Sequence, residues 1–220
     1  MERNLRPLAN RLIKLLLPFA IIFLYVFLLY ISLDWDTFAI VSGGMLVYFV
    51  PPAGKESVIP AMIALGIDPV FAALSIALVD IVGALFLAWN FDLVLRIPLV
   101  GWIVGKMEAK ARATLERNPW MEDVAFLGLV LFVIVPFQGS GAVGASILGN
   151  LISMKPEKIV LAVEIGAISG CLGLAFLSSV VVTLMRQSVV LGVLAIIVII
   201  GSAIALVALK ARSAKRRRGQ

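Results

Sequence analysis

The sequence contains no histidine and only one cysteine, and these absences exclude several kinds of chemistry. Without histidine there is no histidine general base, no histidine haem ligand and no histidine pH switch. Cys171 has no partner for an intramolecular disulfide, and its apolar neighbours in the sequence favour a small buried side chain. A P-loop is also missing, because the nearest match, Gly101–Lys106, is one residue short and is followed by Met107. We therefore expect neither an ATP-driven pump nor an enzyme, and no bound cofactor or metal.

Charged residues are scarce, and this decides the broad class of protein. They make up 15% of the chain, against about 25% in a typical soluble domain. Hydrophobic residues make up 62%, and the mean hydropathy is +1.09. An aqueous core cannot bury that much apolar surface, so we expect a multi-pass protein of the cell (cytoplasmic) membrane. The net charge of +6 is concentrated in the tail 210–220, where it predicts a cytoplasmic C-terminus and not a nucleic-acid contact.

Long apolar runs predict the membrane crossings, because about 20 apolar residues span the hydrocarbon layer. The first run, 15–33, follows a basic stretch and is too long for the core of a signal peptide, so we expect a cytoplasmic N-terminus. Further crossings are expected at 70–89, 159–184 and 189–209.

Two other apolar segments are too short to cross. The run 37–50 forms about 21 Å of helix, whereas the hydrocarbon layer is about 30 Å thick. The run 122–135 is equally short. Proline donates no backbone hydrogen bond and glycine loosens the chain, so each run is expected to end in a turn and return to the same side of the membrane. The expected turn residues are Pro51, Pro52 and Gly54 in the first hairpin and Pro136, Gly139 and Gly141 in the second.

The two broken segments form an internal repeat. Pro51 and Pro136 are 85 residues apart, and Pro69 and Pro156 are 87 apart. The linker between the repeats is rich in basic residues, so the positive-inside rule places it in the cytoplasm. The chain returns to the cytoplasmic side at this point only if both hairpins are re-entrant. We therefore predict an all-α polytopic fold with four full transmembrane helices and two opposed re-entrant hairpins in an inverted repeat, the construction of many secondary transporters.

These boundaries divide a single membrane domain over 1–220. The predicted parts are the first transmembrane helix 15–33, the first repeat 37–89, a cytoplasmic amphipathic linker 91–119, the second repeat 122–184, the last transmembrane helix 189–209 and the basic tail 210–220.

Four charged residues within the apolar segments are the main candidates for substrate binding or proton coupling. Lys55 and Glu56 stand at the first hairpin turn, where Glu56 could accept a proton and Lys55 attract an anionic group. A solvated cap at the lip of a shallow hairpin is the alternative. Asp80 and Glu164 stand within the helices that follow the hairpins, and a hydrogen bond to a neighbouring helix is the alternative to a proton relay.

The second turn carries uncharged polar groups. Gln138 and Ser140 offer polar contacts to a substrate. Gly139 and Gly141 could expose backbone N–H groups to an anion, although a tight turn alone also explains them.

The segment 50–64, with Glu56-Ser57-Val58-Ile59-Pro60, resembles the first hairpin of the family of putative small multidrug export proteins. The segment 135–142, Val-Pro-Phe-Gln-Gly-Ser-Gly-Ala, resembles its second hairpin, and the resemblance covers 42–177. That family is similar in architecture to the DedA and SNARE-associated group, which is implicated in proton-linked transport of polyprenyl-phosphate lipids or in lipid scrambling. The resemblance places Glu56 at the acidic position of the first hairpin. DedA proteins typically carry arginines in the second hairpin, where Gln138 and Ser140 stand here.

We therefore expect a proton-coupled secondary transporter for a lipid-like or amphipathic substrate, with an anionic one included. The alternatives are an energy-independent lipid scramblase and a membrane scaffold that does not transport. The expected partners are membrane lipids and a small amphipathic or lipid-phosphate substrate, and assembly into a homo-oligomer is left open.

Overall fold

The computed structural model describes residues 5–50, 53–96, 120–137, 139–199 and 201–202. Within these ranges every regular element is an α-helix, which confirms the predicted all-α class. The chain divides into two units, Met1–Ala175 and Phe176–Gln220, which are described separately.

Within the described residues, three helices are long and apolar enough to cross a membrane. They are α1 (Leu5–Ser32), α4 (Pro69–Trp89) and α9 (Pro156–Gln187). They match the crossings predicted at 15–33, 70–89 and 159–184. In the second unit, the helix Val189–Ile199 covers the first half of the predicted last crossing, and 203–209 lie outside the described residues.

Pairs of short helices stand where both hairpins were predicted, and their re-entrance into the membrane from opposite faces stays a prediction. The first hairpin consists of α2 (Trp35–Phe49) and α3 (Lys55–Ala64), which pack against each other. The second hairpin consists of α7 (Trp120–Ile134) and α8 (Ala142–Leu151), which also pack against each other. The prediction that the apolar runs break at these turns is confirmed. Pro51 and Pro52 lie outside the described residues, so their own part in the first turn stays a prediction.

Local hydrogen bonds explain where two of these helices begin. The Asp34 carboxylate accepts a hydrogen bond of 2.9 Å from the Thr37 amide and so caps α2. Asp68 caps α4 in the same way through the Phe71 amide at 3.0 Å, and Pro69 supplies the preset backbone angle of a first helical residue. Short polar residues therefore mark both starts.

The helix lengths show the repeat more clearly than the residue identities do. The helices α2 and α7 both have 15 residues and begin 85 positions apart. The helices α3 and α8 both have 10 residues and begin 87 positions apart. The starts of α4 and α9 are also 87 positions apart. The change from 85 to 87 falls between the arms of the hairpins. The second turn therefore contains two more residues than the first, and this explains the two offsets in the sequence.

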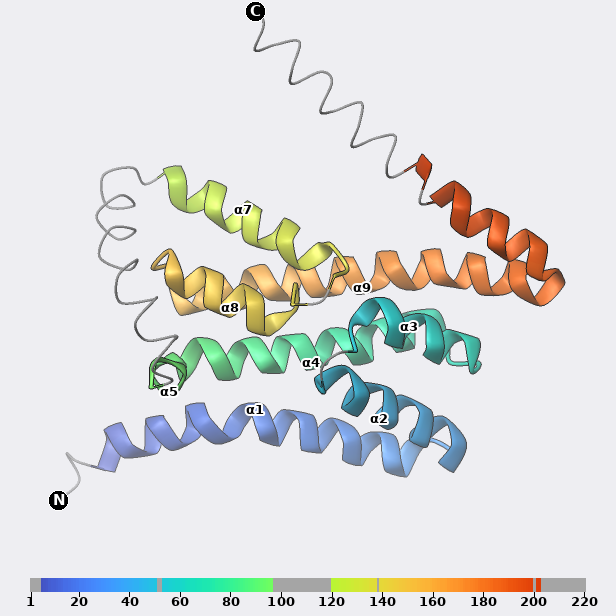
Figure 1. Ribbon diagram of the computed structural model, residues 1–220. Helices are drawn as coiled ribbons and strands as arrows, with labels where there is room; N and C mark the ends of the chain where they lie inside the picture. Colours follow the sequence, from blue (N-terminus) through green and yellow to red (C-terminus); the bar gives the residue numbers. More distant parts are fainter. Residues whose placement is uncertain (1–4, 51–52, 97–119, 138, 200, 203–220) are drawn as a thin grey trace, which may run out of the picture. The chain divides into compact units, whose positions relative to one another are not determined.

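The two hairpins come from opposite ends of the first unit, and their turns face one another beside α4 (Figure 1). Both arms of the first hairpin pack on α4, which also contacts α1 and α8. In the second repeat, glycines allow close approach to α9. A Cβ at Gly166 would lie 2.6 Å from Val133, and one at Gly149 would lie 2.6 Å from Ile159.

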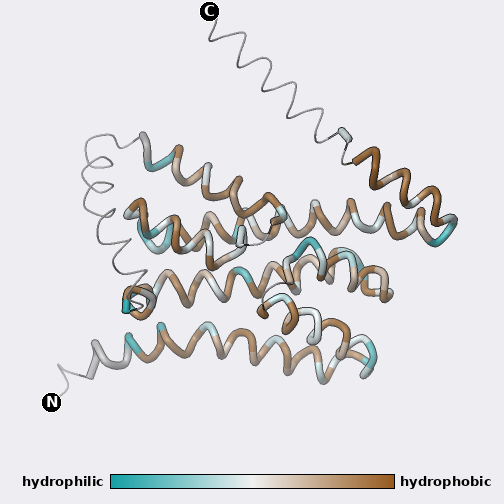
Figure 2. Tube along the Cα trace, viewed as in Figure 1, coloured by the Kyte–Doolittle hydropathy of each residue, from teal (hydrophilic) through white to brown (hydrophobic). Residues whose placement is uncertain are grey.

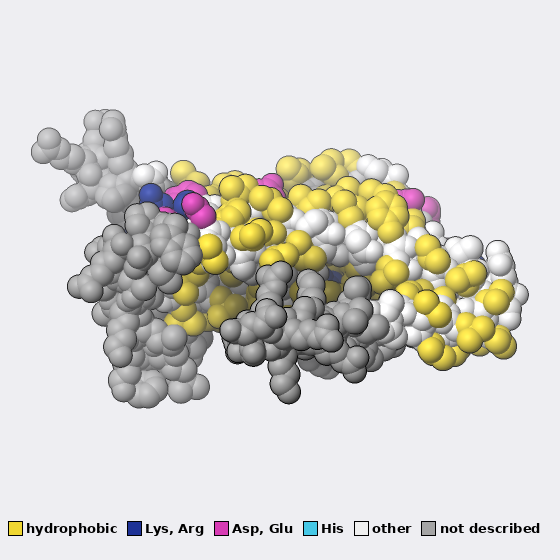
Figure 3. Space-filling model, turned by 90° about the horizontal axis from the view of Figure 1, so that it is seen from above, with side chains coloured by type: hydrophobic (Ala, Val, Ile, Leu, Met, Phe, Trp, Pro, Cys, Tyr) yellow, Lys and Arg dark blue, Asp and Glu magenta, His cyan; other side chains and the backbone are white. Residues whose placement is uncertain are grey.

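Apolar side chains face outward from most of the helices. The tube in Figure 2 is hydrophobic along most of its length and hydrophilic at helix ends and at the start of α3. Charged side chains occupy only a few places on the face in Figure 3. Phe23 in α1 is 72% exposed, and its neighbours Leu24 and Phe27 are also exposed. Such a surface is stable only in lipid, and the protein is therefore a membrane protein.

The region after α4 is only partly described. It begins with α5 (Phe91–Leu95), and residues 97–119 lie outside the described residues. The amphipathic cytoplasmic linker at 91–119 stays a prediction.

Candidate functional site

Asp80 joins the two hairpins at the middle of α4. Its side chain is 3% exposed. The Oδ1 atom accepts a hydrogen bond of 2.8 Å from the Tyr48 hydroxyl near the end of α2. The same atom accepts a second hydrogen bond of 2.8 Å from the backbone N–H of Ala142, the first residue of α8. One carboxylate oxygen therefore bonds to both hairpins.

The Asp80 carboxylate acts as the N-terminal cap of α8. Gly141 occupies the capping position and has no side chain to satisfy the first amides of the helix. A negative charge is favourable at that end of a helix because the free N–H groups point toward it. Glycine is required for this approach, since a Cβ at position 141 would lie 2.6 Å from Asp80 Oδ1 and 2.7 Å from the Tyr48 hydroxyl.

Lys55 makes the opposite contact. It is the first residue of α3 and is 1% exposed. Its Nζ donates a hydrogen bond to the carbonyl of Val133, in the last turn of α7. The amide four residues later, at Phe137, bonds instead to the carbonyl of Val135, so Val133 has no intrahelical donor. A buried lysine from the first hairpin thus caps the C-terminal end of α7, where a positive charge is favourable.

Two carboxylate oxygens beside these contacts are buried without a hydrogen-bond donor among the described residues. They are Asp80 Oδ2 and Glu56 Oε2. The Glu56 side chain folds back over Gly54, where a Cβ would collide with the carboxylate. Tyr48 and Asp80 are hydrogen-bonded to each other, and Lys55 and Glu56 are the first two residues of α3. The four side chains form one group, which we name the turn cluster: Tyr48, Lys55, Glu56 and Asp80.

Ser140 is fully buried, and its hydroxyl bonds to backbone carbonyls within the second turn. Its Oγ lies 2.6 Å from the carbonyl of Val135 and 2.8 Å from that of Phe137, and one hydroxyl proton serves one of them at a time. The adjacent Gly139 has φ +87°, a conformation that favours glycine. These contacts favour a role in closing the second turn. Gln138 lies outside the described residues, and its role in binding stays a prediction.

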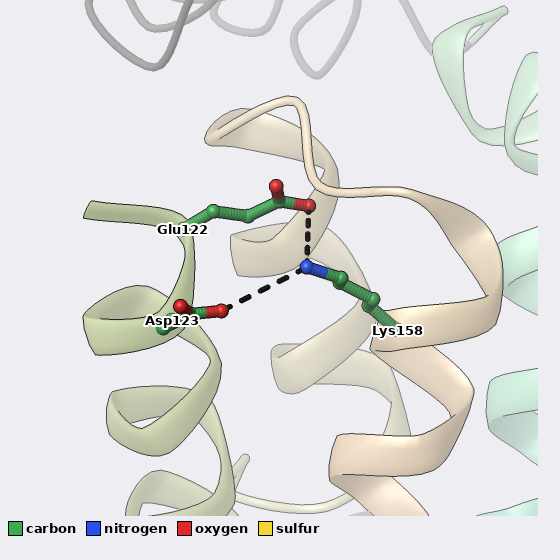
Figure 4. Close-up of polar contacts among 3 residues, drawn as sticks. All are labelled: Glu122, Asp123 and Lys158. Carbon is green, nitrogen blue, oxygen red and sulfur yellow. Dashed lines mark ion pairs between the residues drawn. The ribbon is translucent and has the colours of Figure 1, made fainter. Parts of the chain in front are cut away.

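Glu164 lies apart from the contacts just described. It is exposed on α9, between the exposed side chains of Leu161 and Ile165. Its assignment to substrate binding or proton coupling stays a prediction. Three charged residues are in contact near the start of α9: Lys158 Nζ lies 3.1 Å from Glu122 Oε1 and 3.9 Å from Asp123 Oδ1 (Figure 4). The partly exposed pair of Lys158 and Glu122 holds the start of α9 to the start of α7.

Residues 56–173 match the family described as putative small multi-drug export protein, and the match covers more than half of the chain. The chain belongs to this family. The matched region includes Glu56, Asp80 and the whole second hairpin. No curated protein and no solved structure matches the chain. This match confirms the family that the residues of the two hairpins indicated. The further likeness to the DedA group stays a prediction.

One side chain of this site, Tyr48, was not identified from the sequence. Tyr48 carries a hydroxyl in an otherwise apolar hairpin arm, and its need for a partner was the available signal. Cys171 is fully buried in α9, as expected. The Ala142 amide and the Val133 carbonyl could not have been found, because every residue has such groups.

Proposed function

We propose that this protein is a proton-coupled secondary transporter that exports an amphipathic or lipid-like substrate between the two hairpin turns. The family name and the apolar helices support export across a membrane. We assign the protein to the cytoplasmic membrane, with both termini on the cytoplasmic side, because the basic residues of the linker and of the tail follow the positive-inside rule. The same rule supports hairpins that are re-entrant from opposite faces.

The turn cluster carries the proposal. The turn cluster contains two carboxyl groups and one amino group among apolar helices, so full ionisation would leave it with a net negative charge. Such a charge is expensive in a low-dielectric interior, and one proton or one cationic group would balance it. A purely structural cap of α8 needs neither Glu56 nor the second oxygen of Asp80, and neither Glu56 Oε2 nor Asp80 Oδ2 has a donor among the residues that the structure describes. This surplus acceptor capacity favours a group that binds and releases a proton during transport.

Reconstitution into liposomes with a pH gradient tests the proposal. A fluorescent cationic dye and a fluorescently labelled phospholipid serve as probes, because both are amphipathic. We expect the wild-type protein to move one of them in response to the gradient. In Asp80→Asn, the amide oxygen can still accept the bonds from Tyr48 and Ala142, but the side chain no longer binds a proton. We expect this variant to lose about tenfold or more of the gradient-driven flux.

Asp92→Asn is the matched control, because it removes an exposed carboxylate on α5 that is not part of the turn cluster and should leave the flux unchanged. Equal gradient-driven flux in wild type and Asp80→Asn would refute the coupling role. Movement of the labelled lipid without any gradient, unaffected by Asp80→Asn, would favour the scramblase instead.

A further inference from the structure

The helices of the first unit fall into two groups, each with its own internal contacts. The first group is α1 to α4, where both arms of the first hairpin pack on α4 and Tyr25 in α1 bonds to Ser75 in α4 at 2.8 Å. The second group is α7, α8 and α9 as far as Ala175. Its members are joined by the close contacts of Gly149 and Gly166 and by the Lys158–Glu122 ion pair. The second group is the second repeat, and the first group is the first repeat together with α1.

The seam between the groups runs along α4 and α8, which pack directly on each other. At its centre, a Cβ on Gly83 would lie 3.1 Å from the Cβ of Ala142. The buried residues of α8 are all small: Ala142, Ala145, Ser146 and Gly149. Those of the first hairpin are large, and they include Met45, Ile59 and Met62. Small side chains let the backbones of α8 and α4 approach closely, whereas the first hairpin packs on α4 through large interlocking side chains.

The hydrogen bonds across this seam come from charged side chains. Asp80 binds the N-terminal end of α8, and Lys55 binds the C-terminal end of α7. Separation would leave both charges buried without these partners, which is costly unless another group takes over. A proton on Asp80, or a charged group of a substrate, is such a replacement. Opening of the seam is therefore linked to occupancy of the turn cluster.

We propose that the second repeat separates from α4 during transport and that Asp80–Ala142 and Lys55–Val133 are latches that hold the seam closed until a proton or substrate replaces one of them. This rests on the proposed transport function. The first hairpin stays with α4 throughout, since both of its arms are packed there through large side chains. Tyr48 stays with the first group and keeps its hydrogen bond to Asp80.

A reversible disulfide across the seam tests the movement. Gly83→Cys with Ala142→Cys places two Cβ atoms close together, and a shift of a few tenths of an ångström reaches the usual disulfide separation of about 3.5–4.5 Å. Cys171→Ala is included so that no third thiol competes. We expect oxidation to reduce dye or lipid flux by about tenfold or more, and a reductant to restore it. Unchanged flux after complete oxidation would overturn the proposal.

The matched control is Gly44→Cys with Met62→Cys, which joins α2 to α3 inside the first hairpin, where Gly44 and Met62 are in contact. We expect oxidation of this pair to leave flux unchanged. Equal inhibition by both disulfides would overturn the assignment of the moving part to the second repeat.

A second measurement does not depend on transport, so its failure is distinguishable from failure of the proposed function. Amide hydrogen exchange of the first turn of α8 is followed in detergent for wild type, Asp80→Ala and Asp80→Asn. The alanine variant removes the acceptor for the Ala142 amide, whereas the asparagine variant keeps one. We expect exchange about tenfold faster in Asp80→Ala and close to wild type in Asp80→Asn. Equal exchange in wild type and Asp80→Ala would overturn the latch.

Discussion

The first and second hairpins have helices of the same length, yet their turns carry opposite kinds of polar group. The first turn leads into two charged side chains, Lys55 and Glu56. The second turn offers backbone groups, namely the Val133 carbonyl and the Ala142 amide, with Ser140 closing the loop. One turn therefore supplies charge and the other supplies free helix ends. The comparison teaches that the repeats have become complementary parts of one site and are not two copies of the same site.

The same contrast appears in how the second arms are packed. The helix α3 buries Lys55 and large apolar side chains, whereas α8 buries alanine, serine and glycine. A charged residue at the start of α8 would meet the Asp80 carboxylate and the Tyr48 hydroxyl at close range. Asp80 can therefore reach the end of α8 only because the residues there are small.

The largest effect is expected from Lys55→Met, which removes the charge contributed by the first turn. The Val133 carbonyl loses its donor and the turn cluster loses its only positive charge. We expect the free energy of unfolding to fall by about 3 kcal/mol, measured by thermal unfolding in detergent. Lys158→Met is the control, because Lys158 is partly exposed and its pair should contribute only about 0–1 kcal/mol. Similar losses in both variants would break the contrast between the turn cluster and the surface pair.

A smaller effect is expected from Gly141→Ala, which alters the second turn. The added methyl group would press on Asp80 Oδ1 and on the Tyr48 hydroxyl. We expect a loss of about 1–3 kcal/mol in the free energy of unfolding, together with reduced transport. Gly128→Ala in α7 meets open space and is the control. Because alanine favours helix more than glycine does, this control should be neutral or stabilising by up to about 1 kcal/mol.

Tyr48 in the first hairpin donates a hydrogen bond to Asp80, and its removal should have a smaller effect. Tyr48→Phe removes one hydrogen bond to Asp80 and should lower the free energy of unfolding by about 1–2 kcal/mol. The pH profile of transport should also shift, since one of the two donors to the carboxylate is lost. Tyr25→Phe removes a hydrogen bond of the same length to Ser75. It should weaken the fold without moving the pH profile, and a shift in both variants would contradict the special position of Tyr48.

The smallest effect on stability is expected from Asp34→Ala, which removes the cap at the start of α2, outside the predicted crossings. The hydrogen bond from the Thr37 amide lowers the pKa of Asp34. A carboxyl whose pKa is lowered in the folded state stabilises the fold above its unfolded pKa of about 3.9, and this contribution is lost as the pH falls through the folded pKa. We expect Asp34→Ala to lower the melting temperature slightly at pH 7 and not at all below the folded pKa. If Asp34→Ala lowered the melting temperature equally at both pH values, the loss of stability would not come from the charge of the Asp34 carboxylate.

The sequence alone determined the all-α class, the two breaks in the apolar runs, and the three helices that are long enough to cross a membrane among the described residues. These features depend on local properties: apolar runs of spanning length, and proline or glycine where a run must stop. The runs 15–33 and 70–89 became α1 and α4, and the repeat offsets of 85 and 87 became two turns of unequal length. Lys55, Glu56 and Asp80 were also predicted, because a charged residue in an apolar segment stands out without any structure.

Only the tertiary structure decided what these charges contact. Asp80 reaches the end of α8 because Gly83 and Gly141 let the helices approach, and that distance depends on packing between segments some 60 residues apart in sequence. The partners of Asp80 and Lys55 are backbone groups at helix ends, which look the same at every position of a sequence. For the same reason Ser140 could be predicted as a polar turn residue, but not as one whose hydroxyl is occupied within its own turn. The charges could be found from the sequence, whereas their complementarity with the opposite hairpin required the fold.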